Sequence, residues 1–258
     1  MVSTVVAVLC CVIVIVTGVP SDLKRSDERI VGGTEVAKNE IPWQVSIQFN
    51  NNNDHWCGGS IISEEFIVTT ARCSTYDLRD MQVVAGTLEW AKPGSVHNVT
   101  EIMNSPDWIL GPDSDISLWR VNPPFTFDAS TNIVRLPAQG AQPSPGTVMT
   151  VSGWGITTWS GPRSDFLLKT DMPIVSKSEC NASYAIYGGI GAYQICAGLA
   201  QGGVDACLYD TGGPLFLDGF LHGIYSWGYH ADCAVPGYPG VYTEVSAFRD
   251  WIGQITGI

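Results

Sequence analysis

Six of the eight cysteines in this 258-residue chain have a number and spacing that indicate disulfide chemistry. Cys10 and Cys11 lie in an apolar N-terminal run and leave the chain if that run is removed. The other six are Cys57, Cys73, Cys180, Cys196, Cys207 and Cys233. An even number of cysteines in an oxidising compartment favours disulfides, and six cysteines allow fifteen pairings. No two of the six have the CxxC spacing of a zinc site, so we expect neither a metal nor another cofactor.

The N-terminal segment predicts that oxidising compartment. Residues 5–16 form an unbroken run of twelve apolar residues, whereas crossing a bilayer takes about 20. The run fits the core of a secretory signal cleaved after Gly18, although no Lys or Arg precedes it. A buried strand or an anchor is the alternative. We predict a signal peptide over 1–18, a polar pro-segment over 19–29, one folded domain over 30–258, and secretion to the extracellular space.

If the protein is secreted, two sequons in the sequence can be glycosylated. They are Asn98-Val99-Thr100 and Asn181-Ala182-Ser183. Both asparagines are candidate sites for N-linked glycans.

A series of short motifs runs through residues 30–258. They are Ile30-Val31-Gly32-Gly33, Cys57-Gly58-Gly59-Ser60, Thr69-Thr70-Ala71-Arg72-Cys73, Asp115-Ile116-Ser117-Leu118, Ser152-Gly153-Trp154-Gly155, Asp205-Ala206-Cys207, Asp210-Thr211-Gly212-Gly213-Pro214-Leu215, Ser226-Trp227-Gly228 and Pro239-Gly240-Val241-Tyr242. In type and order they resemble the trypsin/chymotrypsin-like serine proteases (peptidase S1). The resemblance implies two antiparallel β-barrels packed face to face, with a C-terminal α-helix and the site in the cleft between them. It also implies the disulfides Cys57–Cys73, Cys180–Cys196 and Cys207–Cys233.

The catalytic positions implied by the resemblance do not all carry the expected residues. Acyl transfer of this kind needs a hydroxyl nucleophile, a base of near-neutral pKa and a carboxylate that orients the base. The base position holds Arg72, whose guanidinium stays protonated and cannot accept a proton. The nucleophile position holds Thr211, whose extra methyl group crowds a site shaped for serine, while Asp115 is retained. We therefore predict a pseudoenzyme.

The oxyanion position is altered as well. The family has glycine two residues before its nucleophile, and this chain has Tyr209. A residue with a β-carbon adopts the required backbone shape poorly, so we expect Tyr209 to turn its N–H away and its ring to cover the neighbouring pocket. Losing one oxyanion donor costs about 10²–10³-fold in rate.

Other family positions are kept. Asp205 matches the acid at the floor of a trypsin-like pocket, and Gly228 and Gly240 match the glycines that leave room for a ligand side chain. An inherited, covered acid without a ligand is the interpretation we favour for Asp205. Arg29 and Ile30 match the activation site.

Asp210 matches the acid on which the new amino group of Ile30 would dock after cleavage at Arg29. His55 matches the histidine that pairs with this acid in uncut family members. His97, His222 and His230 belong to no motif, so we expect none of them to act as a base.

A direct contact between Arg72 and Asp115 follows from burial. An unpaired buried carboxylate is unfavourable, so we expect the Arg72 guanidinium to turn inward and bond to Asp115. The alternative is that Arg72 points into solvent while backbone donors hold Asp115.

The elements that would position these residues are mainly strands. Short apolar runs rich in Val, Ile and Trp alternate with Gly, Pro, Asn and Ser turns, a pattern typical of an all-β sandwich or barrel. Examples of these runs are 44–49, 60–62 with 66–70, 82–85, 116–121, 147–152 and 220–226. Only the end of the chain has a helical period, with Phe248, Trp251, Ile252 and Ile255 on one face and Ser246 as the expected N-cap.

Composition excludes several classes of protein. The chain is 45% hydrophobic and 15% charged, which argues against intrinsic disorder and against a coiled coil. Its net charge is −12, and residues 1–29 carry three acids and three bases, so the whole imbalance belongs to 30–258. A negatively charged domain lacks the positive surface that binds nucleic acid and is repelled by anionic membrane surfaces, so we expect neither as a partner.

The altered site, the retained cysteines and the predicted secretion resemble the scabies-mite inactivated serine-protease paralogues, which are associated with binding and inhibiting host complement. That resemblance implies a secreted regulatory protein that binds host plasma proteins through surface loops rather than the cleft. Two alternatives remain open. One is a residual or atypical peptidase that uses Thr211, and the other is a decoy that binds substrates or inhibitors in the retained pocket.

Overall fold

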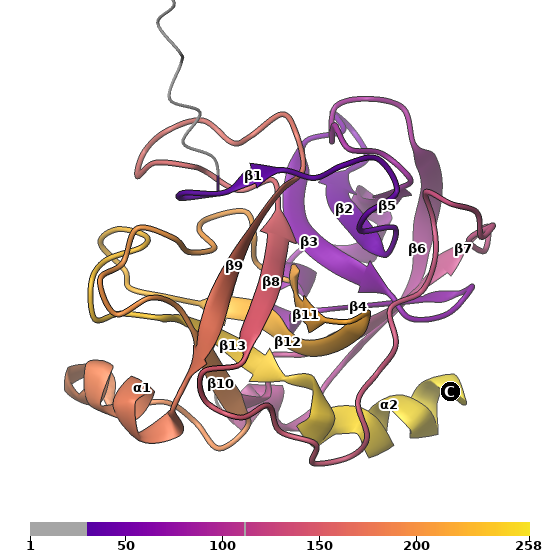
Figure 1. Ribbon diagram of the computed structural model, residues 1–258. Helices are drawn as coiled ribbons and strands as arrows, with labels where there is room; N and C mark the ends of the chain where they lie inside the picture. Colours follow the sequence, from indigo (N-terminus) through magenta and orange to yellow (C-terminus); the bar gives the residue numbers. More distant parts are fainter. Residues whose placement is uncertain (1–29, 111) are drawn as a thin grey trace, which may run out of the picture.

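The computed structural model describes residues 30–110 and 112–258 (Figure 1). The predicted signal and pro-segment, including Arg29, lie outside the described residues. No helix in the described part of the chain is long and apolar enough to cross a membrane.

The first half of the chain forms a closed antiparallel barrel in the strand order β2-β3-β4-β7-β6-β5. Its strands are β2 (Gln44–Phe49), β3 (His55–Ile61), β4 (Phe66–Thr69), β5 (Met81–Ala85), β6 (Ser95–Asn104) and β7 (Ser117–Asn122). Branched and aromatic side chains fill the interior, among them Val45, Ile47, Ile67 and Trp119, all fully buried. Such residues suit a pleated surface with one buried face, which explains why these runs form strands.

The second half, joined by a short strand near the start of the described chain, forms another antiparallel barrel. Its strands are β1 (Thr34–Glu35), β8 (Val148–Gly153), β9 (Leu168–Val175), β10 (Gln194–Ala197), β11 (Pro214–Leu217), β12 (Phe220–Trp227) and β13 (Gly240–Glu244). The sheet runs β1-β9-β10-β13-β12-β11-β8, and pairing of β9 with β8 closes six of these strands into a barrel with β1 at its edge. The predicted all-β fold of two barrels is confirmed.

Helices are short and peripheral (Figure 1). The α2 helix (Arg249–Thr256) confirms the predicted C-terminal helix and buries Ile252 in an apolar cluster with residues of β12. Ser246 is not its N-cap, because a 3₁₀ turn over Val245–Phe248 precedes the helix and the Ser246 hydroxyl donates to Glu244.

The α1 helix (Lys177–Ser183) contradicts the expectation that only the C-terminus is helical. The Ser176 hydroxyl accepts from the backbone N–H of Glu179 (3.2 Å) and donates to the Glu179 carboxylate. This capping box was a readable signal, but the helix is too short to show an apolar period.

All three implied disulfides are present, namely Cys57–Cys73, Cys180–Cys196 and Cys207–Cys233. The first joins β3 to the 3₁₀ turn over Ala71–Ser74, which carries Arg72. It therefore fixes the base position against the first barrel.

Candidate functional site

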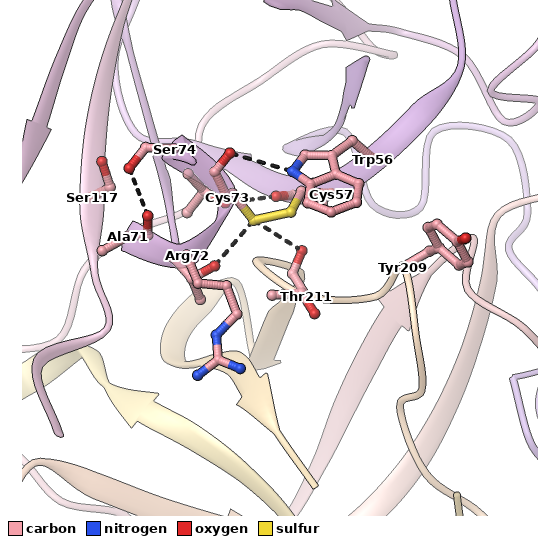
Figure 2. Close-up of a disulfide and its surroundings, with 12 residues drawn as sticks. Trp56, Cys57, Ala71, Arg72, Cys73, Ser74, Ser117, Tyr209 and Thr211 are labelled. Atoms are coloured by element: carbon pink, nitrogen blue, oxygen red, sulfur yellow. Dashed lines mark hydrogen bonds between the residues drawn. A yellow bond between two sulfur atoms is a disulfide. The ribbon is translucent and has the colours of Figure 1, made fainter. Parts of the chain in front are cut away.

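The residues at the three triad positions come together where the two barrels meet. Arg72 lies in the turn after β4, Asp115 lies just before β7, and Thr211 lies in the loop before β11. The backbone carbonyl of Thr211 accepts from Gly58 N on β3 (2.8 Å), which ties this loop of the second barrel to the first. Figure 2 shows Arg72 and Thr211 on either side of the Cys57–Cys73 disulfide.

Arg72 turns inward and bonds to Asp115, as predicted. Its Nε lies 3.1 Å from Asp115 Oδ2, and its backbone N–H donates to Oδ1 (3.0 Å). The Ser226 hydroxyl donates to Oδ2 as well (2.5 Å). Asp115 is fully buried, and this burial raises the pKa of its carboxyl group against the opposing effects of Arg72 and Ser226. At the position that the motif resemblance assigns to the base, the Arg72 guanidinium is thus bonded to the buried Asp115 carboxylate.

Tyr209 has a φ of 73°, so it adopts the left-handed backbone conformation that glycine favours. That its N–H turns away stays a prediction. The expectation for its ring was wrong, because the ring does not line the cavity beside Thr211 and points away from that residue (Figure 2). The ring faces Arg163, whose guanidinium carbon lies 4.7 Å from the ring centroid.

Arg163 explains where the Tyr209 ring goes. Its guanidinium also lies 4.9 Å from the centroid of the Trp90 ring, and it bonds to Asp54 and to the backbone carbonyl of His55. A cation between two rings stabilises both contacts, so Arg163 holds the Tyr209 ring away from the pocket. Sequence reasoning missed Arg163, because nothing in its local sequence signals a partner so far along the chain.

The pocket above Asp205 is filled by the chain itself. Asp205 is 3% exposed and Tyr225 is 5% exposed. A β-carbon built on Gly228 would lie 3.1 Å from the Tyr225 hydroxyl, and one on Gly240 would lie 3.4 Å from the Tyr225 ring. Tyr225 therefore occupies the space that the two glycines leave open. The favoured interpretation of Asp205 as a covered acid agrees with this geometry.

Burial dominates the electrostatics of Asp205. It raises the pKa of the Asp205 carboxyl to about 8, and Oδ1 has no hydrogen-bond partner among the described residues. Asp205 is also absent from the residues that line the cavity beside Thr211. Sequence reasoning missed Tyr225, although an aromatic residue directly before Ser226-Trp227-Gly228 was a readable signal.

His55 does not pair with Asp210. Its Nδ1 lies 2.7 Å from the Ser46 hydroxyl and its Nε2 lies 3.0 Å from the carbonyl oxygen of Tyr209. Its ring is buried, which lowers its pKa to about 4. The expectation was wrong because the backbone of Tyr209, one residue earlier, presents the nearer acceptor.

Asp210 bonds to backbone donors instead. It accepts from Gly155 N (2.7 Å) and Cys207 N (2.9 Å), and burial raises the pKa of its carboxyl to about 7. Ile30 is fully buried. Docking of a new Ile30 amino group on Asp210 stays a prediction.

The other histidines occupy different places. His97 bonds to the Pro123 carbonyl and the Ser95 hydroxyl, and His222 is partly buried on β12. His230 stacks on Trp227, with ring centroids 6.5 Å apart, and lines the same cavity as Thr211. No hydrogen bond joins His230 to Thr211 in the described part of the chain.

The two sequon asparagines are exposed. Asn98 lies on β6 and Asn181 lies on α1. Glycosylation at either one stays a prediction.

Comparison with known proteins shows the family. The Trypsin family model matches residues 30–252. The chain is 38% identical over 235 residues to trypsin 5G1 of Aedes aegypti, covering 91% of this chain and 87% of that protein. It is 40% identical over 238 residues to trypsin-1 of Astacus astacus (86% and 98%) and 39% identical over 236 residues to anionic trypsin of Canis lupus familiaris (88% and 89%). The two-barrel fold and its cleft define a trypsin-like serine protease fold, and the chain belongs to the trypsin family.

Proposed function

We propose that this member of the trypsin family is a secreted, catalytically inactive homologue that acts by binding other proteins. The observation that carries the proposal is the bond between the Arg72 guanidinium and Asp115. A guanidinium does not give up its proton, so it cannot take the proton of a hydroxyl nucleophile. Asp115, which would orient a catalytic histidine, is already bonded to Arg72 and Ser226.

Two further observations support inactivity. Thr211 carries a methyl group beside its hydroxyl, which crowds attack on a substrate carbonyl. Tyr225 fills the pocket above Asp205, which disfavours entry of an Arg or Lys side chain. The filled pocket also argues against a decoy that binds substrates or inhibitors there. Loss of the base and loss of substrate positioning affect separate parts of the reaction.

The partners we propose are host plasma proteins of the complement system, with the protein acting as an inhibitor. This partner class comes from the resemblance to the mite paralogues. Three disulfides cross-link the two-barrel scaffold. The sequence of its surface loops can vary more widely when catalysis is not required.

A peptidase assay tests inactivity. The wild type, purified after secretion, is assayed on Arg and Lys peptides and labelled with a serine-directed organophosphate, beside the reversion Arg72→His, Tyr209→Gly, Thr211→Ser. We expect no turnover and no labelling of the wild type. Turnover of the wild type equal to that of the revertant would overturn the proposal. N-terminal sequencing of the same sample shows whether the chain begins at Val19 or at Ile30.

A complement assay tests the binding role. The protein is added to human plasma, and complement-dependent lysis of sensitised red cells is measured, with reduced and alkylated protein as the control. We expect the folded protein to reduce lysis in a dose-dependent way. Equal lysis with the folded and the unfolded protein contradicts a complement role, while leaving inactivity intact.

Residual peptidase activity is the second candidate, and one observation favours it. His230 and Thr211 line the same cavity, so this cavity holds a histidine and a hydroxyl. If the wild type cleaves a peptide, His230→Ala should abolish the cleavage. Activity that survives this change removes His230 as the base.

A further inference from the structure

The Arg72 side chain has donors that its bond to Asp115 does not use. Of the three guanidinium nitrogens only Nε bonds to Asp115, and the two terminal nitrogens make no hydrogen bond with any residue that the structure describes. The Arg72 side chain is 39% exposed and lines the cavity beside Thr211, while Asp115 is fully buried. A guanidinium presents its terminal N–H groups as a planar fork that matches a carboxylate.

The fork borders a cavity of about 160 Å³. Arg72 is the only Asp, Glu, Lys or Arg residue among those that line it, so no carboxylate in the lining competes with a bound anion. Thr211 adds a hydroxyl that has no hydrogen-bond partner among the described residues. The apolar walls come from Trp159, Leu208 and Trp227.

Asp205 does not supply the negative charge that this region holds in a trypsin-like pocket. It lies under Tyr225, is 3% exposed and does not line the cavity. Burial also raises its pKa to about 8, so the buried carboxyl is mostly neutral at pH 7. The charge that reaches the cavity is therefore that of Arg72, which is positive.

We propose that this cavity is a binding site for a single carboxylate, supplied by an acidic side chain or a C-terminus of a partner protein. The Arg72 fork and the Thr211 hydroxyl bind the carboxylate oxygens, and the apolar walls contact the carbon stem. The proposal rests on the proposed function, because it needs a cleft that binds without cutting. It adds one contact inside the cleft to the contacts that the surface loops make with the partner protein.

A neighbouring cavity extends the site. It has a volume of about 240 Å³ and shares Arg72, Trp227 and His230 with the first. Tyr187 stands at an edge-to-face angle to His230, with ring centroids 5.6 Å apart, so the wall is aromatic. Asp113 also lines this second cavity and disfavours a second acid there. We therefore expect one acidic residue followed by an apolar or aromatic one.

Benzoate and benzamidine form the pair of probes for this site. The two have nearly the same shape and opposite charge. Binding of each to the folded wild type is measured by titration calorimetry and by the NMR signals of the Trp indole N–H groups. We expect benzoate to bind with shifts of the cleft indoles, and benzamidine to bind at least tenfold more weakly.

Variants assign the contact. Arg72→Gln removes the fork, and we expect at least tenfold weaker benzoate binding, because charge-assisted hydrogen bonds are lost. Arg72→Lys keeps the positive charge next to Asp115 but lacks the guanidinium fork, and we expect severalfold weaker benzoate binding. This variant replaces Arg72→Gln in the experiment if Arg72→Gln does not fold. Thr211→Val should weaken binding severalfold. Arg249→Gln, a matched loss of charge on α2, should leave binding unchanged.

Peptide probes separate the two sources of the carboxylate. Ac-Ala-Glu-Phe-NH₂ carries only a side-chain acid, Ac-Ala-Gln-Phe-OH carries only a terminal one, and Ac-Ala-Gln-Phe-NH₂ carries neither. Binding of either acid with none for the neutral peptide supports the site and identifies the source. No benzoate binding, equal binding by Arg72→Gln, or tighter binding of benzamidine overturns it. Peptidase activity of the wild type would overturn the proposed function instead, so the two failures are distinguishable.

Discussion

Replacing Tyr225 by valine should open the pocket above Asp205. A β-carbon built on Gly228 would contact the Tyr225 hydroxyl and one built on Gly240 would contact the Tyr225 ring, and the Tyr225 side chain is almost fully buried. Truncating a buried aromatic side chain leaves a cavity and costs roughly 2–4 kcal/mol of folding free energy. At about 2–4 °C per kcal/mol for a chain of this size, the Tm should fall by roughly 5–15 °C.

The opened pocket should then bind benzamidine, because the amidinium can reach Asp205. Saturation at about 100 times Kd restores roughly 2.7 kcal/mol, so the ligand should return much of the lost Tm. The assay is thermal unfolding with and without benzamidine. Tyr225→Phe is the matched control, since it keeps the ring and should show no such ligand effect. Equal benzamidine shifts for the wild type and Tyr225→Val would refute the idea that the ring closes the pocket.

Three further changes test other parts of the molecule. Burial raises the pKa of Asp205 to about 8 in the folded state, above its ordinary value of 3.8, so the folded state keeps a proton that the unfolded chain releases. The stabilisation from this proton is present below the unfolded pKa and is lost as pH rises through 8. The unfolding free energy of the wild type should therefore fall relative to Asp205→Asn between pH 4 and pH 8, by up to about 5 kcal/mol, and parallel curves would contradict this. Arg163→Gln removes the contacts with the Trp90 and Tyr209 rings and the bonds to the first barrel. We expect the unfolding free energy in denaturant titrations to fall by about 1–3 kcal/mol. An unchanged denaturation midpoint would show that these contacts do not contribute to stability. Deglycosylation should reduce the mass of the secreted wild type but not that of the variant with both Asn98→Gln and Asn181→Gln, and an unchanged wild-type mass would show both sequons unoccupied.

Local patterns predicted seven of the thirteen strands that the structure describes. The run 44–49 coincides with β2, and 66–70, 82–85 and 220–226 each differ from their strands by one residue at an end. Such runs have a clear apolar character bounded by turn residues. These apolar runs do not predict which strands pair with each other, because the pattern within one strand shows which face is buried and does not show which strand lies beside it. The two-barrel arrangement came from the motif order.

The bond between Arg72 and Asp115 was predictable because it follows from one local requirement, the need of a buried carboxylate for a partner. Two failures at the site came from contacts between distant segments. His55 was expected to reach Asp210, but the backbone of Tyr209 lies in the way as the nearer acceptor. The direction of the Tyr209 ring depends on Arg163, which lies on another loop.

The sequence by itself determined the chemistry available to this protein. The residue types at Arg72 and Thr211 place a guanidinium and a threonine at the positions that the motif resemblance assigns to the base and the nucleophile, and six cysteines follow the N-terminal run. The tertiary structure decided what space surrounds those groups. Only folding brings Tyr225 close to both Gly228 and Gly240 and leaves two Arg72 nitrogens without a hydrogen-bond partner among the described residues. The physical reason is that charge and proton affinity belong to a residue, whereas the room around it is set by packing among segments far apart in the chain.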